Sequence, residues 1–140
     1  MSDTERIAAL VHSYARLLDT GDVEGVVALF EDSTWRSYPN ASVLHGSDEV
    51  RPIYENLRDR SGGHQSKHLI TNLSIEVGPD ATNASSHCYW TVLRTAPGRG
   101  IDITLSGQYT DTFEKVDDRW RFTDRLISTD LDGATSNPLT

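Results

Sequence analysis

A few side chains in this sequence could carry proton-transfer chemistry, and they fall on separate predicted elements. Asp19 stands at the end of a predicted helix, Tyr14 lies on the apolar stripe of that helix, and His68 lies in a predicted strand. A neutral imidazole can accept a proton near pH 7, and a carboxylate at its other ring nitrogen fixes the tautomer and stabilises the imidazolium. Such a pair suits abstraction of a carbon-bound proton, followed by loss of water, halide or an equivalent group.

Each of these residues also has a purely structural interpretation. Asp19 could simply end its helix before Gly21, and His68 could be a satisfied core or rim residue of its strand. Tyr14 could pack in the core with its hydroxyl group hydrogen-bonded. The residues taken alone leave both interpretations open.

Other polar and aromatic residues are candidates for the wall of a substrate pocket. His87 and Tyr89 share one face of a later strand, which would be either solvent-exposed or a wet pocket wall. Arg125 could bind an anionic group or pair with Asp111. The remaining candidates for substrate binding are Trp35, Tyr38, Tyr54 and Asn72.

Three helices are predicted in the first half of the chain. Residues 2–19 place apolar side chains three and four positions apart, and Ser2 begins a capping-box pattern. Asp22 is typical of the N-cap of a second helix. A third helix opens at residues 46–48, and Pro52 suggests that its regular part begins close to that proline.

The hydrophobic period changes to two in the second half of the chain. A short strand is predicted at residues 34–38, and four long strands follow at 65–77, 84–95, 101–115 and 119–129. Tight turns between the long strands predict antiparallel pairing. The expected fold is α+β, a cone-like curved antiparallel sheet covered by three N-terminal helices. We expect one domain over residues 1–131 and a flexible tail over 132–140.

Composition limits the classes of partner. The chain has 140 residues, a formal net charge of −8 and a single cysteine. The negative charge argues against nucleic acid and against an anionic membrane surface. Clustered histidine and carboxylate residues typical of a metal site are not evident, and we expect no cofactor. The expected protein is cytoplasmic and binds a small hydrophobic organic molecule.

The order of several motifs resembles the SnoaL-like family, which belongs to the nuclear-transport-factor-like superfamily of cystatin-like α+β cones. Members include scytalone dehydratase, bile-acid 7α-dehydratase and hexachlorocyclohexane dehydrochlorinase. The resemblance covers about residues 5–128. The matching segments are residues 14–22, 29–32 with Trp35, 45–47, 68–72, 107–111, and 120–122 with Arg125.

The resemblance implies roles for three residues. The dehydratase and dehydrochlorinase branches place an aspartate at the end of the first helix and a partner histidine on the first long strand. Asp19 and His68 match those positions, and Tyr14 matches a helix tyrosine. The implied activity is that of a cofactor-independent, dehydratase-like lyase acting on a small hydrophobic cyclic metabolite. His68 would be the general base, Asp19 its orienting partner and Tyr14 a hydrogen-bond donor.

Two other classes of function remain open at this point. A polyketide cyclase or an isomerase would use the same pocket for proton transfer without a leaving group. A non-catalytic binder or subunit would have a filled pocket or a separated histidine and aspartate. The resemblance also implies a homodimer or homotrimer, in which an open sheet face carrying residues such as Val92 and Leu105 would be covered.

Overall fold

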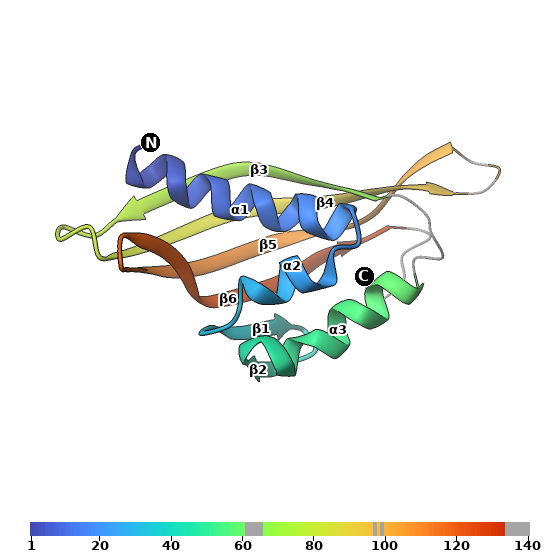
Figure 1. Cartoon of the computed structure of the whole chain (residues 1–140). Helices are drawn as coiled ribbons and strands as arrows, with labels where there is room; N and C mark the ends of the chain where they lie inside the picture. Colours follow the sequence, from blue (N-terminus) through green and yellow to red (C-terminus); the bar gives the residue numbers. More distant parts are fainter. Residues whose placement is uncertain (61–65, 97, 99, 134–140) are drawn as a thin grey trace.

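The computed structural model describes residues 1–60, 66–96, 98 and 100–133. Three helices cover one side of a long curved sheet (Figure 1), so the expected α+β class is confirmed. The helices are α1 (Asp3–Asp19), α2 (Val23–Ala28) and α3 (Gly46–Arg60). The strands are β1 (Thr34–Tyr38), β2 (Val43–His45), β3 (Ser66–Val77), β4 (Asn83–Ala96), β5 (Gly100–Val116) and β6 (Arg119–Asp132).

The six strands form one sheet in the order β2-β1-β6-β5-β4-β3. The four long strands pair antiparallel with their neighbours in sequence, as the tight turns predicted. The sheet is nevertheless mixed, because β1 arrives from the helical half of the chain and runs parallel to β6. β2 was not expected from the sequence and adds an antiparallel edge to β1.

Irregular pairing bends the sheet around the helices. The β3–β4 register shifts between Thr71 and Ser74, where Asn72 adopts a left-handed conformation with φ of 56°. A second shift lies between Val92 and Leu93 in the β4–β5 pair. Bulges of this kind increase local twist and bend the strand, which gives the sheet the concave face that receives the helices.

α1 begins and ends, and α2 begins, as the sequence predicts, whereas α2 ends at Ala28, before the expected helical positions Leu29 and Phe30. The Ser2 side chain accepts from the backbone of Glu5, and the Glu5 carboxylate accepts from the backbone of Ser2. Gly21 has a φ of 71° after the end of α1, and the Asp22 carboxylate caps α2 by accepting from Gly25. These local caps fix where α1 stops, and therefore where Asp19 lies.

The third helix opens at residues 46–48 as predicted, but the expectation that its regular part begins close to Pro52 is wrong. α3 begins at Gly46, six positions before Pro52, and the proline lies inside the helix. Proline removes one backbone N–H donor, but its side chain is exposed and the helix continues around it. Buried Val50 and Tyr54 on either side of it hold α3 against its neighbours, so packing outweighs the lost hydrogen bond.

The helices and the concave face of the sheet enclose an aromatic core. α1 lies along the sheet against β3, and α2 packs on α3 (Figure 1). Tyr14 makes edge contacts with Phe30 at 5.8 Å and with Tyr109 at 5.6 Å between ring centroids. Trp90 stacks on Tyr109 at 5.8 Å. This ring packing fixes the position of the Tyr14 side chain between α1 and the sheet.

A glycine on β5 is required by close strand packing. A Cβ atom at Gly107 would lie 1.9 Å from the Ser128 carbonyl oxygen and 2.6 Å from the Trp90 ring. We expect Gly107→Ala to lower the free energy of unfolding by about 1–3 kcal/mol or more, because the neighbouring backbone must move. Urea unfolding measures this, with exposed Thr110→Ala on the same strand as the control; equal stability of the two variants would contradict the expectation.

None of the described helices covers the convex face of the sheet, and the residues exposed on this face differ from those expected. Val92 and Leu105 are each 1% exposed and belong to the core, so they do not form an outer apolar face. Tyr89, Ile101 and Ile103 are among the large apolar side chains that β4 and β5 expose instead, because side chains alternate between the faces of a strand. Self-association remains a prediction.

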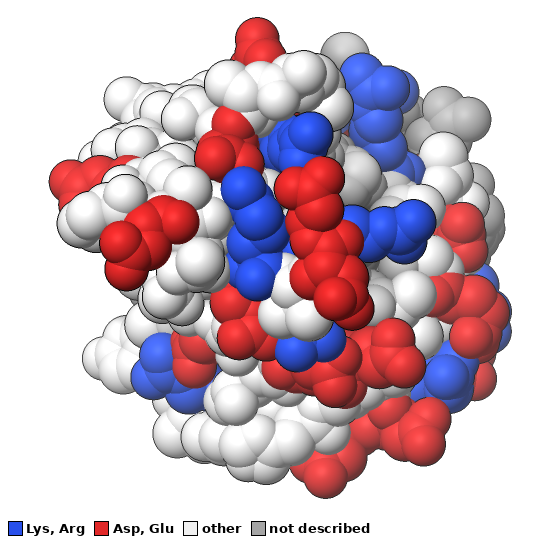
Figure 2. All heavy atoms as spheres, turned by 60° about the vertical axis from the view of Figure 1, so that its left-hand side comes forward, with Lys and Arg blue, Asp and Glu red and all other residues white. Residues whose placement is uncertain are grey.

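The surface carries the acidic balance of the sequence. On the face shown in Figure 2, aspartate and glutamate side chains surround and separate smaller groups of lysine and arginine. None of the helices that the structure describes is long and apolar enough to cross a membrane. Favourable binding to nucleic acid would require a continuous basic surface, and this face does not present one.

Candidate active site

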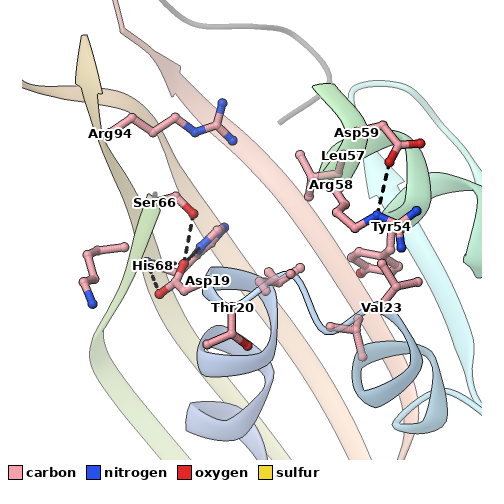
Figure 3. Close-up of a pocket in the computed structure, with 14 residues that line it drawn as sticks. Asp19, Thr20, Val23, Tyr54, Leu57, Arg58, Asp59, Ser66, His68 and Arg94 are labelled. Carbon is pink, nitrogen blue, oxygen red and sulfur yellow. Dashed lines mark hydrogen bonds and ion pairs between the residues drawn. The ribbon is translucent and has the colours of Figure 1, made fainter. Parts of the chain in front are cut away.

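The end of α1 and the start of β3 bring Asp19 and His68 together. The His68 Nδ1 atom lies 2.6 Å from Asp19 Oδ1. The backbone N–H of His68 donates to both carboxylate oxygens, at 3.1 and 3.0 Å, and the Ser66 hydroxyl donates at 3.1 Å (Figure 3). One carboxylate therefore joins the helix to the strand and orients the imidazole.

The electrostatics of Asp19 favour its charged form. Burial alone would raise its pKa, but hydrogen bonds from the His68 ring, the His68 backbone and Ser66 hold the pKa below the ordinary value. An ionised Asp19 accepts a hydrogen bond from Nδ1–H, which assigns the neutral tautomer with hydrogen on that nitrogen. The other ring nitrogen, Nε2, has no hydrogen-bond partner among the described residues and is left as a proton acceptor.

The lowered pKa of Asp19 predicts a pH-dependent contribution to stability. The ionised carboxylate contributes fully above the ordinary value of 3.8, and the contribution is lost as pH falls through the lower folded value. We expect the difference in free energy of unfolding between the wild type and Asp19→Asn to shrink from about pH 5 to about pH 3. Urea unfolding across this range measures it, and a difference independent of pH would contradict the assignment.

Two cavities meet at this pair. The larger, of about 750 Å³, lies between the C-terminal ends of α1 and α3 and the β3–β4 strands; Asp19, Ser66 and Arg94 line it. The smaller, of about 270 Å³, has tyrosine and tryptophan rings in its wall together with aliphatic and polar side chains. The residues that line both cavities are Leu18, Tyr54, Leu57 and His68. His68 therefore borders a larger cavity that carries charged side chains and a smaller one whose wall includes aromatic rings.

A pair of tyrosines lies in the smaller cavity. The Tyr14 and Tyr54 hydroxyl oxygens are 2.7 Å apart, and Trp35 Nε1 donates to the Tyr54 hydroxyl at 2.8 Å. Burial raises the pKa of Tyr14 and raises that of Tyr54 well above its ordinary value, so both phenols stay protonated near neutral pH. Their mutual bond uses one phenolic proton, which leaves the other for a ligand oxygen.

The structure divides the predicted substrate-binding residues into two groups. Trp35, Tyr38 and Tyr54 line the smaller cavity, next to Tyr14. His87 and Tyr89 lie on the convex face, where His87 Nε2 is 2.6 Å from the Gln108 side-chain oxygen. Strand alternation puts them opposite the buried neighbours that face the core, so neither lines these cavities.

Asn72 and Arg125 also lie outside the two cavities. Asn72 is exposed at the β3 bulge, where the extra residue turns its side chain away from the concave face. Arg125 is fully buried beneath Tyr14 and Tyr109 and makes two 2.8 Å hydrogen bonds to Asp111. Of the two roles considered for Arg125, the structure shows pairing with Asp111.

Several residues of the site were not expected from the sequence. Ser66 holds the Asp19 carboxylate, and Arg94 lines the larger cavity. Trp90 and Tyr109 line the smaller one. Trp90 and Arg94 occupy alternate positions of β4 with core Val92 between them, so strand periodicity could have placed all three on the inner face.

Other kinds of chemistry have less support from the described residues. Cys88 is fully buried, and burial raises the pKa of its thiol to about 11, so it is not a thiolate nucleophile near neutral pH. The part of the chain that the structure describes contains no group of three or more histidine, cysteine, aspartate or glutamate side chains placed to hold a metal ion. The histidine–aspartate pair is the chemistry that this geometry offers.

Comparison with known protein families identifies the family of this chain. A family model described as a SnoaL-like domain matches residues 1–126 of the 140. The chain therefore belongs to the SnoaL-like family, as the motifs indicated. No curated protein gives a significant match.

Solved structures share this fold. A variant of Rv3472 from Mycobacterium tuberculosis, a protein of unknown function, is 29% identical with a TM-score of 0.73, over 91% of this chain and 71% of that one. A protein named "putative scytalone dehydratase" from Novosphingobium aromaticivorans is 28% identical with a TM-score of 0.73, over 91% and 84%. A further Novosphingobium protein, NTF2-like with a cystatin-like fold, is 21% identical with a TM-score of 0.79, over 98% and 88%. The expected nuclear-transport-factor-like, cystatin-like architecture is confirmed.

Proposed function

We propose that this protein is a cofactor-independent lyase that removes water from a small hydrophobic cyclic metabolite. The observation that carries this proposal is the 2.6 Å hydrogen bond between His68 Nδ1 and Asp19, on a ring that borders both cavities. The other ring nitrogen has no hydrogen-bond partner in the described part of the chain. The distance meets the geometric requirement for an oriented general base. The similarity to the Novosphingobium protein named for scytalone dehydratase agrees with this class.

In the proposed reaction one residue takes a proton from the substrate and another gives a proton to the departing oxygen. His68 Nε2 takes the proton from a substrate carbon, and the electrons of that C–H bond form a new carbon–carbon double bond. The C–O bond on the neighbouring carbon breaks, and the free phenolic proton of the Tyr14–Tyr54 pair passes to the departing oxygen to give water. Transfer of the proton from His68 back to the phenolate restores the resting state. Asp19 stabilises the imidazolium formed in between.

The cavities support a catalytic role over a non-catalytic one. A binder or subunit would have a pocket filled by side chains or a separated pair, whereas Asp19 and His68 are hydrogen-bonded beside about 750 Å³ of space. The aromatic wall of the smaller cavity suits a ring compound. The same base could instead serve a cyclase or an isomerase, for which the product would keep the elements of water.

Product mass tests the proposal directly. The purified chain is incubated with a panel of hydrophobic cyclic alcohols that carry an acidic C–H next to the hydroxyl-bearing carbon, and products are analysed by mass spectrometry. Loss of water that requires His68 supports the lyase. Conversion at unchanged mass assigns the cyclase or isomerase instead, and water loss that persists fully in His68→Gln contradicts the proposed base.

A further inference from the structure

Arg94 lies on the same face of the sheet as the catalytic pair. In the β3–β4 register Arg94 is opposite Ser66, and His68 is opposite Val92. His68 and Arg94 are therefore diagonal neighbours across two strands, roughly 7–8 Å apart by general sheet geometry, with their Cβ atoms somewhat closer. Figure 3 shows the Arg94 side chain extending from β4 into the space between the sheet and the end of α3.

Arg94 differs from the other arginines of the structure in being half-buried without an anionic partner. The ion-paired arginines are Arg6, Arg36, Arg51, Arg58, Arg121 and Arg125. Arg94 has neither an ion pair nor a hydrogen bond among the described residues, and its Nε atom is buried without a partner. Burial lowers its pKa. Withdrawing a guanidinium from water without compensation is costly, which indicates that a ligand supplies the missing anion.

The carboxylates nearest Arg94 do not supply that anion. Asp102 is opposite Arg94 in the β4–β5 register, but no ion pair joins the two among the described residues. Asp19 is bound by His68 and Ser66, and Asp59 accepts a hydrogen bond from Arg58. Lys67, the next residue to His68 on β3, is exposed and also lines the larger cavity, but it is a cation and supplies no anion. Both carboxylates that line the larger cavity are thus engaged, and Arg94 is left facing it.

We propose that Arg94 binds a carboxylate on the substrate, so that the substrate is an aromatic or alicyclic carboxylic acid. A guanidinium forms two parallel hydrogen bonds with a carboxylate, which fixes orientation as well as charge. In this arrangement the substrate carboxylate binds Arg94 in the larger cavity and the substrate ring occupies the smaller one. The substrate carbon atoms that link the two groups then lie next to His68, which borders both cavities. This assignment rests on the proposed function for the role of His68, and it defines Arg94 as a specificity-determining residue.

Binding of two matched inert probes tests the assignment. Isothermal titration calorimetry compares 2-naphthoate with 2-naphthamide, which share the ring but differ in charge. We expect the wild type to bind the naphthoate about tenfold more tightly or better, because hydrogen bonds to a charged group are the stronger kind. Arg94→Gln should remove this preference, and Arg94→Lys, which keeps the charge, should retain part of it.

Control variants separate this assignment from a general charge effect and from the proposed reaction. Arg119→Gln removes one exposed positive charge at the β5–β6 turn and should leave the preference unchanged. His68→Gln should also keep it, because binding of these probes requires no turnover. A wild type that binds neither probe or both equally, or an Arg94→Gln variant that keeps the preference, overturns the assignment. If the preference depends on Arg94 but turnover does not depend on His68, the proposed reaction fails and the carboxylate site stands.

Discussion

Replacing His68 with glutamine is expected to lower kcat for water loss by about 10²–10⁴-fold, the usual contribution of a positioned general base. Glutamine keeps a polar side chain of similar reach, but it cannot take a proton near pH 7. The variant keeps the Asp19 carboxylate, which bonds the His68 ring in the wild type, and the cavity beside it. The measurement is the rate of product formation by mass spectrometry on the substrate identified in the alcohol panel.

The sheet provides a matched control for this variant. His87 is on the convex face, bonded to Gln108 and away from both cavities. His87→Gln should therefore leave kcat unchanged, although it makes the same chemical substitution in the neighbouring strand. Circular dichroism and urea unfolding establish that both variants are folded. Equal rates for the two variants would show that His68 is not the base.

Asp19 should contribute less to the rate than His68 does. Asp19→Asn keeps a side-chain oxygen that can accept from the His68 ring, but it removes the charge that stabilises the imidazolium. We expect kcat to fall while the probe affinity at Arg94 changes little. A larger loss of kcat in His68→Gln than in Asp19→Asn would identify His68 as the base and Asp19 as the residue that orients it.

Local sequence signals predicted the helices that place Asp19. The capping pattern at Ser2, the glycine at position 21 and the Asp22 cap each act within a few residues, so a single sequence contains the whole signal. Residues 46–48 also marked where α3 opens, but the start of its regular part could not be predicted in this way. Pro52 would favour a start near itself, but buried Val50 and Tyr54 supply tertiary packing that the local sequence does not reveal.

The site was harder to predict because it depends on which face of the sheet each residue occupies. Strand alternation groups His87 with Tyr89, but only the bulges and the register show that this pair faces outward. The pairing of Asp19 with His68 came from family resemblance rather than from spacing. Arg94 was missed because a charged residue near a strand end is usually solvated, and its lack of a partner is visible only in three dimensions.

Replacing Arg125 with methionine is expected to lower the free energy of unfolding by about 3–5 kcal/mol, because Asp111 would be left as an uncompensated buried charge. Both side chains are fully buried and joined by two 2.8 Å hydrogen bonds. The guanidinium also lies over Tyr14 at 4.3 Å and Tyr109 at 4.0 Å from the ring centroids. Urea unfolding at neutral pH measures the loss.

The control is an exposed ion pair that involves Asp124, the residue before Arg125 on β6. Arg36 pairs with Asp124 at 2.8 Å on the surface, and Arg36→Met should cost only about 0–1 kcal/mol, the usual worth of such a pair. Similar losses for Arg125→Met and Arg36→Met would contradict the assigned role of burial. We expect the double variant Asp111→Leu with Arg125→Met to be more stable than Arg125→Met alone, since no charge remains unpaired.

The double variant also tests whether the buried pair serves the fold alone or the site as well. Arg125 contacts the ring of Tyr14, whose hydroxyl is half of the proton-donating pair with Tyr54. A folded double variant with a lower kcat and unchanged probe affinity would assign Arg125 as a positioning residue for Tyr14. Because Arg125 lies outside both cavities, wild-type turnover in that variant would assign the pair to the stability of the core only.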